Sequence, residues 1–175
     1  MKRLFDIGFS LIGIVLFSPL WFVLSFLIWI EDQEEIVFKQ KRIGKNKNTF
    51  EILKFRTMRN GKVTKIGGYL RKTGLDETLQ FINVLKGDMS IIGPRPLTES
   101  DIQRLAWTGD HHAVRWLIRP GISGPAQIFG AGSAAVSLEM DLQYIKVQST
   151  RKDLYFLVLS FMVNILGKSR VRKML

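Results

Sequence analysis

The run IGFSLIGIVLFSPLWFVLSFLIWI, residues 7–30, contains no charged side chain and decides the architecture of the chain. As a straight helix it would reach roughly 36 Å, enough to cross a membrane hydrocarbon layer. The acidic stretch EDQEE follows it directly, where a cleavable signal peptide would have small residues. We therefore expect residues 1–30 to stay in the protein as a membrane helix.

Two features favour a helix that enters and leaves the membrane on one side. Ser18 and Pro19 stand in the middle of the run, where proline removes a backbone hydrogen bond and bends a helix. The Ser18 hydroxyl is expected to bond to the Ile14 carbonyl. Both flanks are basic, since Lys2 precedes the run and residues 39–72 contain twelve Lys or Arg against one acid. Basic flanks prefer the cytoplasmic side of a membrane, and a re-entrant helix keeps both flanks there. An ordinary single-span helix is the alternative.

The composition suits one further domain, residues 31–175, and an acidic partner. The 175 residues are 46% hydrophobic and 23% charged, which is enough for one compact core. There is no cysteine, which excludes disulfides and thiolate metal sites. The formal net charge of +11 indicates nucleic acid, anionic lipid headgroups or a phosphorylated small molecule as partner, and charge alone does not choose among them.

Beyond the membrane run, the pattern predicts a mainly helical α+β fold. Two β-prone runs, 36–43 and 49–58, predict a short hairpin, whereas the glycine-containing segments 62–74 and 119–133 are expected to be largely irregular. Apolar spacing and stop signals predict helices near 75–86, over 99–107, within 112–118, over 134–146 and over 153–166.

The C-terminal segment YFLVLSFMVNIL, residues 155–166, is short for a membrane span. It fits an interfacial amphipathic helix, and the basic sequence KSRVRK after it would favour anionic headgroups of membrane lipids. A buried core helix would show the same pattern.

Two adjacent carboxylates, Asp76 and Glu77, stand in the sequence TGLDETLQ of this basic chain. Thr73 and Asp76 fit a helix capping box, which is the simplest structural explanation. Adjacent helical residues point about 100° apart, so Glu77 needs another reason. Cations in the flanking segments would hold phosphates beside an ionised carboxylate: Lys54, Arg56, Arg59, Arg71, Lys72 and Arg95. Such a site suits a carboxylate that attacks a phosphoryl group or binds magnesium.

The sequence IIGPRP, residues 91–96, displays an arginine from a stiff loop. Pro94 and Pro96 fix the backbone on either side of Arg95. The planar arginine fork matches phosphate oxygens, which predicts a phosphate contact. A proline-rich connector with a solvated arginine is the alternative.

The sequence LDETLQFINVLKGDMSIIGPRPL, with KFRTM upstream and RPGISGPAQI downstream, closely resembles the monotopic phosphoglycosyl transferases of the bacterial sugar transferase family. The similarity covers nearly the whole chain, whose length resembles the minimal catalytic form of that family. It implies a monotopic protein at the cytoplasmic face of the bacterial inner membrane, with a nucleotide sugar donor, usually a UDP-sugar, and undecaprenyl phosphate as polyprenyl acceptor. It also implies Mg²⁺ as cofactor and later glycosyltransferases that extend the product.

The resemblance assigns roles to the residues singled out above. Asp76 matches the family's nucleophile, with Glu77 as its catalytic partner, and we expect both to serve as metal ligands. The loop Pro94-Arg95-Pro96 matches the family's phosphate contact, and we expect Lys54, Arg56 and Arg71 to bind substrate as well. The expected reaction transfers a sugar-1-phosphate through a covalent aspartyl phosphosugar, releases UMP and starts glycoconjugate assembly.

Some residues depart from the family pattern. Pro125 stands where relatives commonly have tryptophan in Gly-Trp-Ala-Gln, and the sequence FGAGS, residues 129–133, lacks the usual Asn-Gly-Arg, so the sugar stays undetermined. The adjacent His111 and His112 are expected to be exposed loop residues rather than metal ligands. Two alternatives are a membrane-tethered protein that binds nucleic acid through residues 39–72 and a non-catalytic scaffold. The resemblance favours the enzyme, with no nucleic-acid partner.

Overall fold

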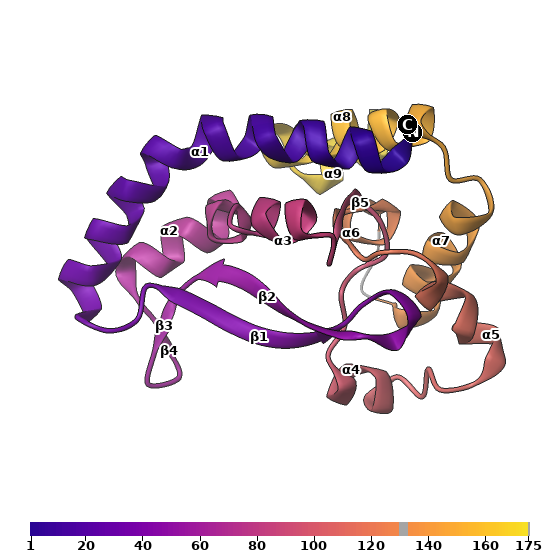
Figure 1. Ribbon diagram of the computed structural model, residues 1–175, viewed down its shortest axis with the longest axis horizontal. Helices are drawn as coiled ribbons and strands as arrows, with labels where there is room; N and C mark the ends of the chain where they lie inside the picture. Colours follow the sequence, from indigo (N-terminus) through magenta and orange to yellow (C-terminus); the bar gives the residue numbers. More distant parts are fainter. Residues whose placement is uncertain (130–132, 175) are drawn as a thin grey trace.

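A computed structural model describes residues 1–129 and 133–174, apart from the side chains at positions 32, 169, 172 and 173. Its mainly helical α+β fold confirms the predicted class (Figure 1). The helices are α1 Lys2–Asp32, α2 Lys65–Thr73, α3 Gln80–Lys86, α4 Glu99–Arg104, α5 Asp110–Ala113, α6 Pro125–Phe129, α7 Ala134–Lys146, α8 Thr150–Leu166 and α9 Lys168–Met174. The strands are β1 Val37–Ile43, β2 Thr49–Phe55, β3 Met58–Arg59, β4 Lys62–Val63, β5 Ser90–Ile92 and β6 Gly121–Ser123. Three 3₁₀ turns are η1 Lys45–Lys47, η2 Leu75–Glu77 and η3 Val114–Leu117.

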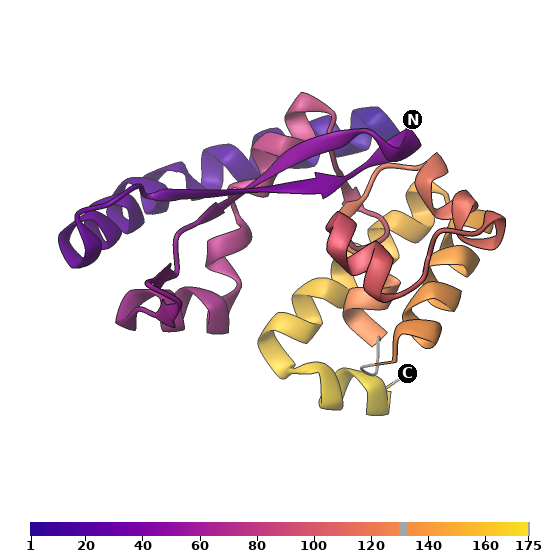
Figure 2. The ribbon, with the colours of Figure 1, turned by 90° about the horizontal axis from the view of Figure 1, so that it is seen from below.

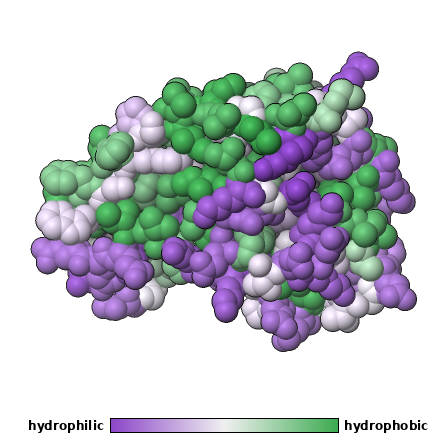
Figure 3. All heavy atoms as spheres, viewed as in Figure 1, coloured by the Kyte–Doolittle hydropathy of each residue, from purple (hydrophilic) through white to green (hydrophobic). Residues whose placement is uncertain are grey.

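Helix α1 is long, apolar and bent (Figure 1). Pro19 lies inside it, and the Ser18 hydroxyl donates to the Val15 carbonyl at 3.0 Å rather than to the predicted carbonyl of Ile14. By length and composition this helix could cross a membrane, and only 17% of its most apolar window is buried. Figure 3 shows hydrophobic side chains gathered along the edge of the molecule that α1 forms. Its exposed large apolar residues include Leu11, Ile12, Val15, Leu16, Phe22, Val23 and Phe26.

Both ends of α1 are bound to the remainder of the protein. In its first turn, the Lys2 ammonium pairs with Asp153 of α8 at 2.7 Å. In its last turn, the Glu31 carboxylate accepts from the backbone N–H groups of Lys65 and Ile66, at 2.8 and 3.1 Å. The start and the end of the apolar helix therefore contact the same folded body.

The inner face of α1 packs on the hairpin and the short helices. Strands β1 and β2 pair antiparallel from Val37↔Phe55 to Ile43↔Thr49, which confirms the predicted hairpin with a shorter second strand. In the view of Figure 2, α2 and the C-terminal helices project from the same side of this hairpin. One apolar cluster joins α1 to β2, α2 and the start of α3 through Leu24, Ile28, Phe55, Leu70 and Leu79. A second lies under β5 and contains Ile52, Val84, Met89, Ile91, Ile92 and Tyr144.

Two segments that were predicted to be largely irregular form a helix and a strand, because their glycines allow another part of the backbone to approach closely. In α2, a Cβ at Gly67 would lie 2.2 Å from the Thr57 carbonyl oxygen, so glycine lets the helix approach the end of β2. In the predicted loop 119–133, β6 pairs parallel with β5. A Cβ at Gly121 would lie 2.1 Å from the Gly93 nitrogen. Residues 130–132, within the sequence FGAGS, lie outside the described residues.

The C-terminal helices follow the apolar pattern. Helix α7 spans the predicted 134–146, and α8 begins at Thr150, earlier than the predicted 153, because the Ser149 side chain caps it. Helix α4 ends at Arg104, before the predicted 107. The buried residues Asp153 and Leu159 anchor α8, while it exposes Leu154, Tyr155, Val158, Phe161 and Ile165. So many exposed apolar side chains are not expected of a buried core helix, and the interfacial position of α8 stays a prediction.

Candidate active site

Asp76 and Glu77 lie in the 3₁₀ turn η2, between α2 and α3. Gly74, with a φ of 72°, ends α2 and begins this turn. The Thr73 hydroxyl bonds back to the carbonyls of Tyr69 and Leu70, at 2.8 and 3.1 Å. The predicted capping box between Thr73 and Asp76 is therefore wrong, and capping does not explain either carboxylate.

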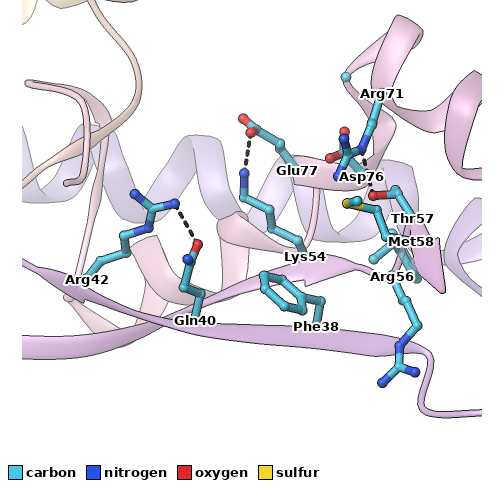
Figure 4. Close-up of a pocket in the computed structure, with 12 residues that line it drawn as sticks. Phe38, Gln40, Arg42, Lys54, Arg56, Thr57, Met58, Arg71, Asp76 and Glu77 are labelled. Carbon is cyan, nitrogen blue, oxygen red and sulfur yellow. Dashed lines mark hydrogen bonds and ion pairs between the residues drawn. The ribbon is translucent and has the colours of Figure 1, made fainter. Parts of the chain in front are cut away.

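The two carboxylates line an open cavity of about 790 Å³. Its other walls come from the hairpin and α2, as Figure 4 shows. Four cationic side chains line it: Arg42, Lys54, Arg56 and Arg71. A cavity of this size and charge fits a phosphorylated small molecule.

Asp76 is the buried member of the carboxylate pair. Its residue is 8% exposed, and burial, followed by repulsion from Glu77, raises its pKa above the ordinary value. Lys54 and Arg71 oppose this shift in the pKa. Glu77 forms an ion pair with Lys54 at 2.6 Å, whereas no residue in the described ranges forms an ion pair with Asp76. Asp76 therefore presents a carboxylate beside cations without being locked to one of them.

The predicted substrate-binding cations are placed differently around the pair. Lys54 faces Glu77, and Arg71 holds its position by donating from Nε to the Thr57 hydroxyl at 2.8 Å. The Arg56 guanidinium points away from the carboxylates in Figure 4 and pairs with Glu34 and Glu35. Lys54 and Arg71 therefore lie beside the carboxylates, whereas the guanidinium of Arg56 is directed away from them toward Glu34 and Glu35.

The loop Pro94-Arg95-Pro96 reaches the site from the Glu77 side. Arg95 and Pro96 line a smaller pocket of about 70 Å³ that also includes Lys54 and Glu77. The Pro94 carbonyl accepts from the Gly121 N–H at 2.9 Å, which fixes the loop to β6. Arg95 therefore borders Glu77, outside the residues that line the larger cavity.

Sequence reasoning missed Arg42, which lines both the cavity and the smaller pocket. It donates to the Pro96 carbonyl at 3.2 Å and to the Gln40 side chain at 2.6 Å, while its buried Nε has no partner among the described residues. Its sequence context is one basic position among twelve, so no local signal singles it out. Gln127 was also missed; it lines the smaller pocket and has a buried side-chain oxygen without a described partner.

An apolar groove of about 400 Å³ meets the cationic cavity at Gly74 and Glu77. Its walls include Phe17 of α1 and Phe81 of α3, whose rings stack 5.9 Å apart. Helix α8 contributes Leu157, Phe161 and Val163, among others. The groove thus leads from the long apolar helix α1 to Glu77.

The carboxylate pair suits magnesium in its usual binding mode. Mg²⁺ takes one or two protein carboxylates and completes its shell with substrate phosphates and water. Asp76 and Glu77 could supply these two ligands, and a cation would relieve the repulsion that raises the pKa of Asp76. The described residues contain no group of three or more metal-ligating side chains.

The adjacent histidines lie in a short helix rather than the predicted loop. Both belong to α5, where the His112 ring stacks on Trp107 at 6.0 Å and meets the His111 ring edge-on at 5.5 Å. Neither lines the cavity or the groove described above. Aromatic packing accounts for His112 without a metal.

Comparison with known proteins places this geometry in a family. The family model described as bacterial sugar transferase matches residues 1–167. The chain belongs to the bacterial sugar transferase family. The cationic cavity and the Asp76–Glu77 pair lie within the residues that this bacterial sugar transferase shares with the family model, as does the apolar groove apart from Lys168.

Three curated relatives illustrate the similarity. UDP-N-acetylgalactosamine-undecaprenyl-phosphate N-acetylgalactosaminephosphotransferase of Aeromonas hydrophila is 38% identical over 83% of this chain and 39% of its own length. UDP-glucose:undecaprenyl-phosphate glucose-1-phosphate transferase of Escherichia coli (strain K12) is 30% identical over 97% of this chain and 41% of its own. Exopolysaccharide production protein ExoY of Rhizobium meliloti (strain 1021) is 32% identical over 87% and 80%. This sugar transferase therefore spans about two fifths of the first two relatives and most of the third.

Proposed function

We propose that this sugar transferase moves a sugar-1-phosphate from a UDP-sugar to undecaprenyl phosphate. One observation carries the proposal: the apolar groove meets the cationic cavity at Glu77, next to Asp76 in the same 3₁₀ turn. A soluble diphosphate donor suits the first, and the tail of a lipid phosphate suits the second. The names of two relatives specify transfer from a UDP-sugar to undecaprenyl phosphate for those proteins, which supports the same reaction class here.

In the first half-reaction, an Asp76 carboxylate oxygen attacks the β-phosphorus of the donor. The bond between this phosphorus and the bridging oxygen breaks, UMP leaves, and an aspartyl phosphosugar remains. Lys54 and Arg71 neutralise phosphate oxygens near Asp76, as their effect on its pKa indicates. Mg²⁺ bound by Asp76 and Glu77 would supply further neutralisation of the phosphate charge.

In the second half-reaction, a phosphate oxygen of the lipid attacks the same phosphorus. The bond to Asp76 breaks, the carboxylate is regenerated, and the product is a polyprenyl diphosphate sugar. Phe17, Phe81 and Phe161 line the groove, and a lipid tail lying along them would bring its phosphate head beside Glu77. Later glycosyltransferases would extend this product into a longer glycan.

A screen of UDP-sugars with undecaprenyl phosphate in detergent tests the reaction. We expect one or a few UDP-sugars to give UMP and a lipid-linked sugar in equal amounts, and Asp76→Asn to give neither. Absence of UMP with every UDP-sugar would contradict the proposal. Tight, salt-dependent binding of RNA or DNA in its place would favour the nucleic-acid alternative.

The same geometry supports a monotopic topology at the cytoplasmic face of the bacterial inner membrane. Lys2 and Glu31, near opposite ends of α1, both bind the catalytic body, so a straight crossing would separate contacts that the fold joins. Cysteine labelling can test this because the chain has no cysteine. Leu4→Cys and Lys45→Cys should react with an impermeant reagent only from the cytoplasmic side. Labelling of Leu4→Cys from the periplasm alone would establish a single span instead.

A further inference from the structure

A buried ion pair lies behind the Arg95 loop, away from the carboxylates. Arg115 of η3 and Asp141 of α7 are 2% and 1% exposed, and the Arg115 Nε donates to Asp141 at 3.1 Å. The Arg115 guanidinium also lies over the rings of Trp107 and Trp116, 5.4 and 5.0 Å from their centroids. A buried pair of this kind is weak evidence for a stabilising role, because removing two charges from water costs about as much as their attraction returns.

The ion pair contacts the backbone of Arg95, the residue that borders Glu77. The second guanidinium nitrogen of Arg115, Nη2, donates to the carbonyl of Arg95. The backbone of Arg95 in turn lowers the pKa of Asp141, against the larger effect of burial, which raises it. Arg115 therefore holds the Arg95 carbonyl directly, and Asp141 acts on it by holding Arg115.

The two prolines explain why the loop needs such contacts. Pro94 and Pro96 have no N–H, so two of the three residues cannot donate to a backbone ladder. The loop is held through its carbonyls instead: Pro94 accepts from the Gly121 N–H, Arg95 from Arg115, and Pro96 from Arg42. A charged donor makes the stronger hydrogen bond, and here it holds the central residue.

We propose that Arg115 and Asp141 are positioning residues that fix the Arg95 backbone and thereby aim its guanidinium at the Glu77 side of the site. This inference rests on the proposed function and on the expectation from the sequence that the Arg95 guanidinium contacts the transferring phosphate. The ion pair touches none of the reacting groups and acts through Arg95 alone. A misplacement of the guanidinium by about 1 Å is expected to reduce turnover about 100-fold.

A double replacement separates this role from a structural one. In Arg115→Met/Asp141→Leu both charges are replaced by apolar side chains, so no charge is left buried alone and the fold should keep its unfolding midpoint. We expect kcat to fall by about 10- to 100-fold. Leu138→Ala is the control, because Leu138 is buried in the same cluster as Trp107 and Trp116 but its side chain has no group that can hydrogen-bond to the loop carbonyls. It should lower the unfolding midpoint and keep kcat at temperatures well below that midpoint.

A double-mutant cycle with Arg95→Ala gives the readout that a structural role would not produce. If the pair acts only through Arg95, adding the double replacement to Arg95→Ala should change kcat by less than about twofold. A further loss as large as in the wild-type background would overturn the proposal, as would a wild-type kcat in the double replacement. If the double replacement itself fails to fold, Arg115→Lys provides the same cycle while keeping the buried charge. Wild-type protein that releases no UMP would refute the proposed function itself, whereas active wild type with additive losses refutes only the positioning role.

Discussion

The cationic cavity and the apolar groove share an edge at Gly74 and Glu77 but differ in nearly every other respect. The cavity is built by the hairpin and α2, and its lining carries Arg and Lys. The groove is built by α1, α3 and α8 together with β5, β6 and α6, and its lining combines aromatic and aliphatic side chains with polar ones that include Arg95 and Lys168. In the proposed reaction, the cavity would hold the charged, soluble donor and the groove the lipid tail.

The shared edge determines the order of events in the proposed reaction. If donor and acceptor approach one carboxylate from different sides, Asp76 can hold the phosphosugar while the donor's nucleotide leaves. Variants on each side of the edge should then affect different half-reactions, and a variant at the edge should affect both.

Asp76→Asn should have the largest effect, because the amide keeps the size of the carboxylate and removes the nucleophile. We expect turnover to fall by at least about 10⁴-fold, with UMP release and transfer to lipid lost together. Initial rates and far-ultraviolet circular dichroism would check activity and folding. Full turnover would reduce Asp76 to a structural or metal-binding role.

Arg95→Lys should come next, since lysine keeps the charge but loses the planar fork. We expect kcat to fall by about 10²- to 10³-fold, the loss typical of removing one transition-state donor. Arg104→Lys is a matched control, because Arg104 lines neither the cavity nor the smaller pocket and pairs with Asp101 of α4, and its kcat should change little. Wild-type kcat in Arg95→Lys would mean that a positive charge alone suffices at this position.

Phe161→Ser should weaken the groove and leave the cavity unchanged. The KM for undecaprenyl phosphate should rise about tenfold, because an apolar contact with the lipid is lost, while the KM for the UDP-sugar stays constant. Tyr155→Ser alters the same helix outside the lining of the groove and serves as the control. A change in the KM for the UDP-sugar would contradict this separation, because it would mean that the groove also contributes to donor binding.

The smallest effects are expected in the pH profile of kcat/KM. Asp76 must be ionised to attack, so activity falls as the pH drops through its pKa, which burial and Glu77 raise. Lys54→Met removes a cation that lowers this pKa and should move the acid limb to higher pH. Glu77→Gln removes the repulsion between the two carboxylates, so the acid limb of the activity that remains should move to lower pH. Lys62→Met alters a cation outside the cavity and should leave the acid limb in place. Shifts of Lys54→Met to lower pH and of Glu77→Gln to higher pH would exclude Asp76 as the titrating group.

The sequence predicted those elements whose signals are local. Helix α7 follows its apolar spacing, and the strands of the hairpin follow their β-prone runs. Helix α2 was missed because Gly67 reads as a helix breaker when its contact with Thr57 is unknown. Strand β6 was missed because its partner, β5, lies 31 positions earlier in its register, Ser90↔Gly121, and three residues carry no periodicity.

The candidate site shows the same limit. The carboxylates and the Pro-Arg-Pro loop are contiguous motifs, so the sequence displays them. Arg42 and the pair Arg115–Asp141 reach the loop only through the tertiary fold, across separations of 54 and 20 positions to the residues they contact. Arg56 shows the converse, since its sequence neighbourhood suggested a phosphate ligand and the fold pairs it with Glu34.

Intact-mass spectrometry of the donor half-reaction tests the central claim most directly. The protein is mixed with its UDP-sugar and Mg²⁺ in the absence of lipid, and we expect a mass increase of one sugar phosphate that maps to the peptide containing Asp76. Addition of undecaprenyl phosphate should remove the increase and yield the lipid product. No adduct in an enzyme that turns over, or initial-rate patterns that require both substrates bound at once, would contradict the covalent mechanism.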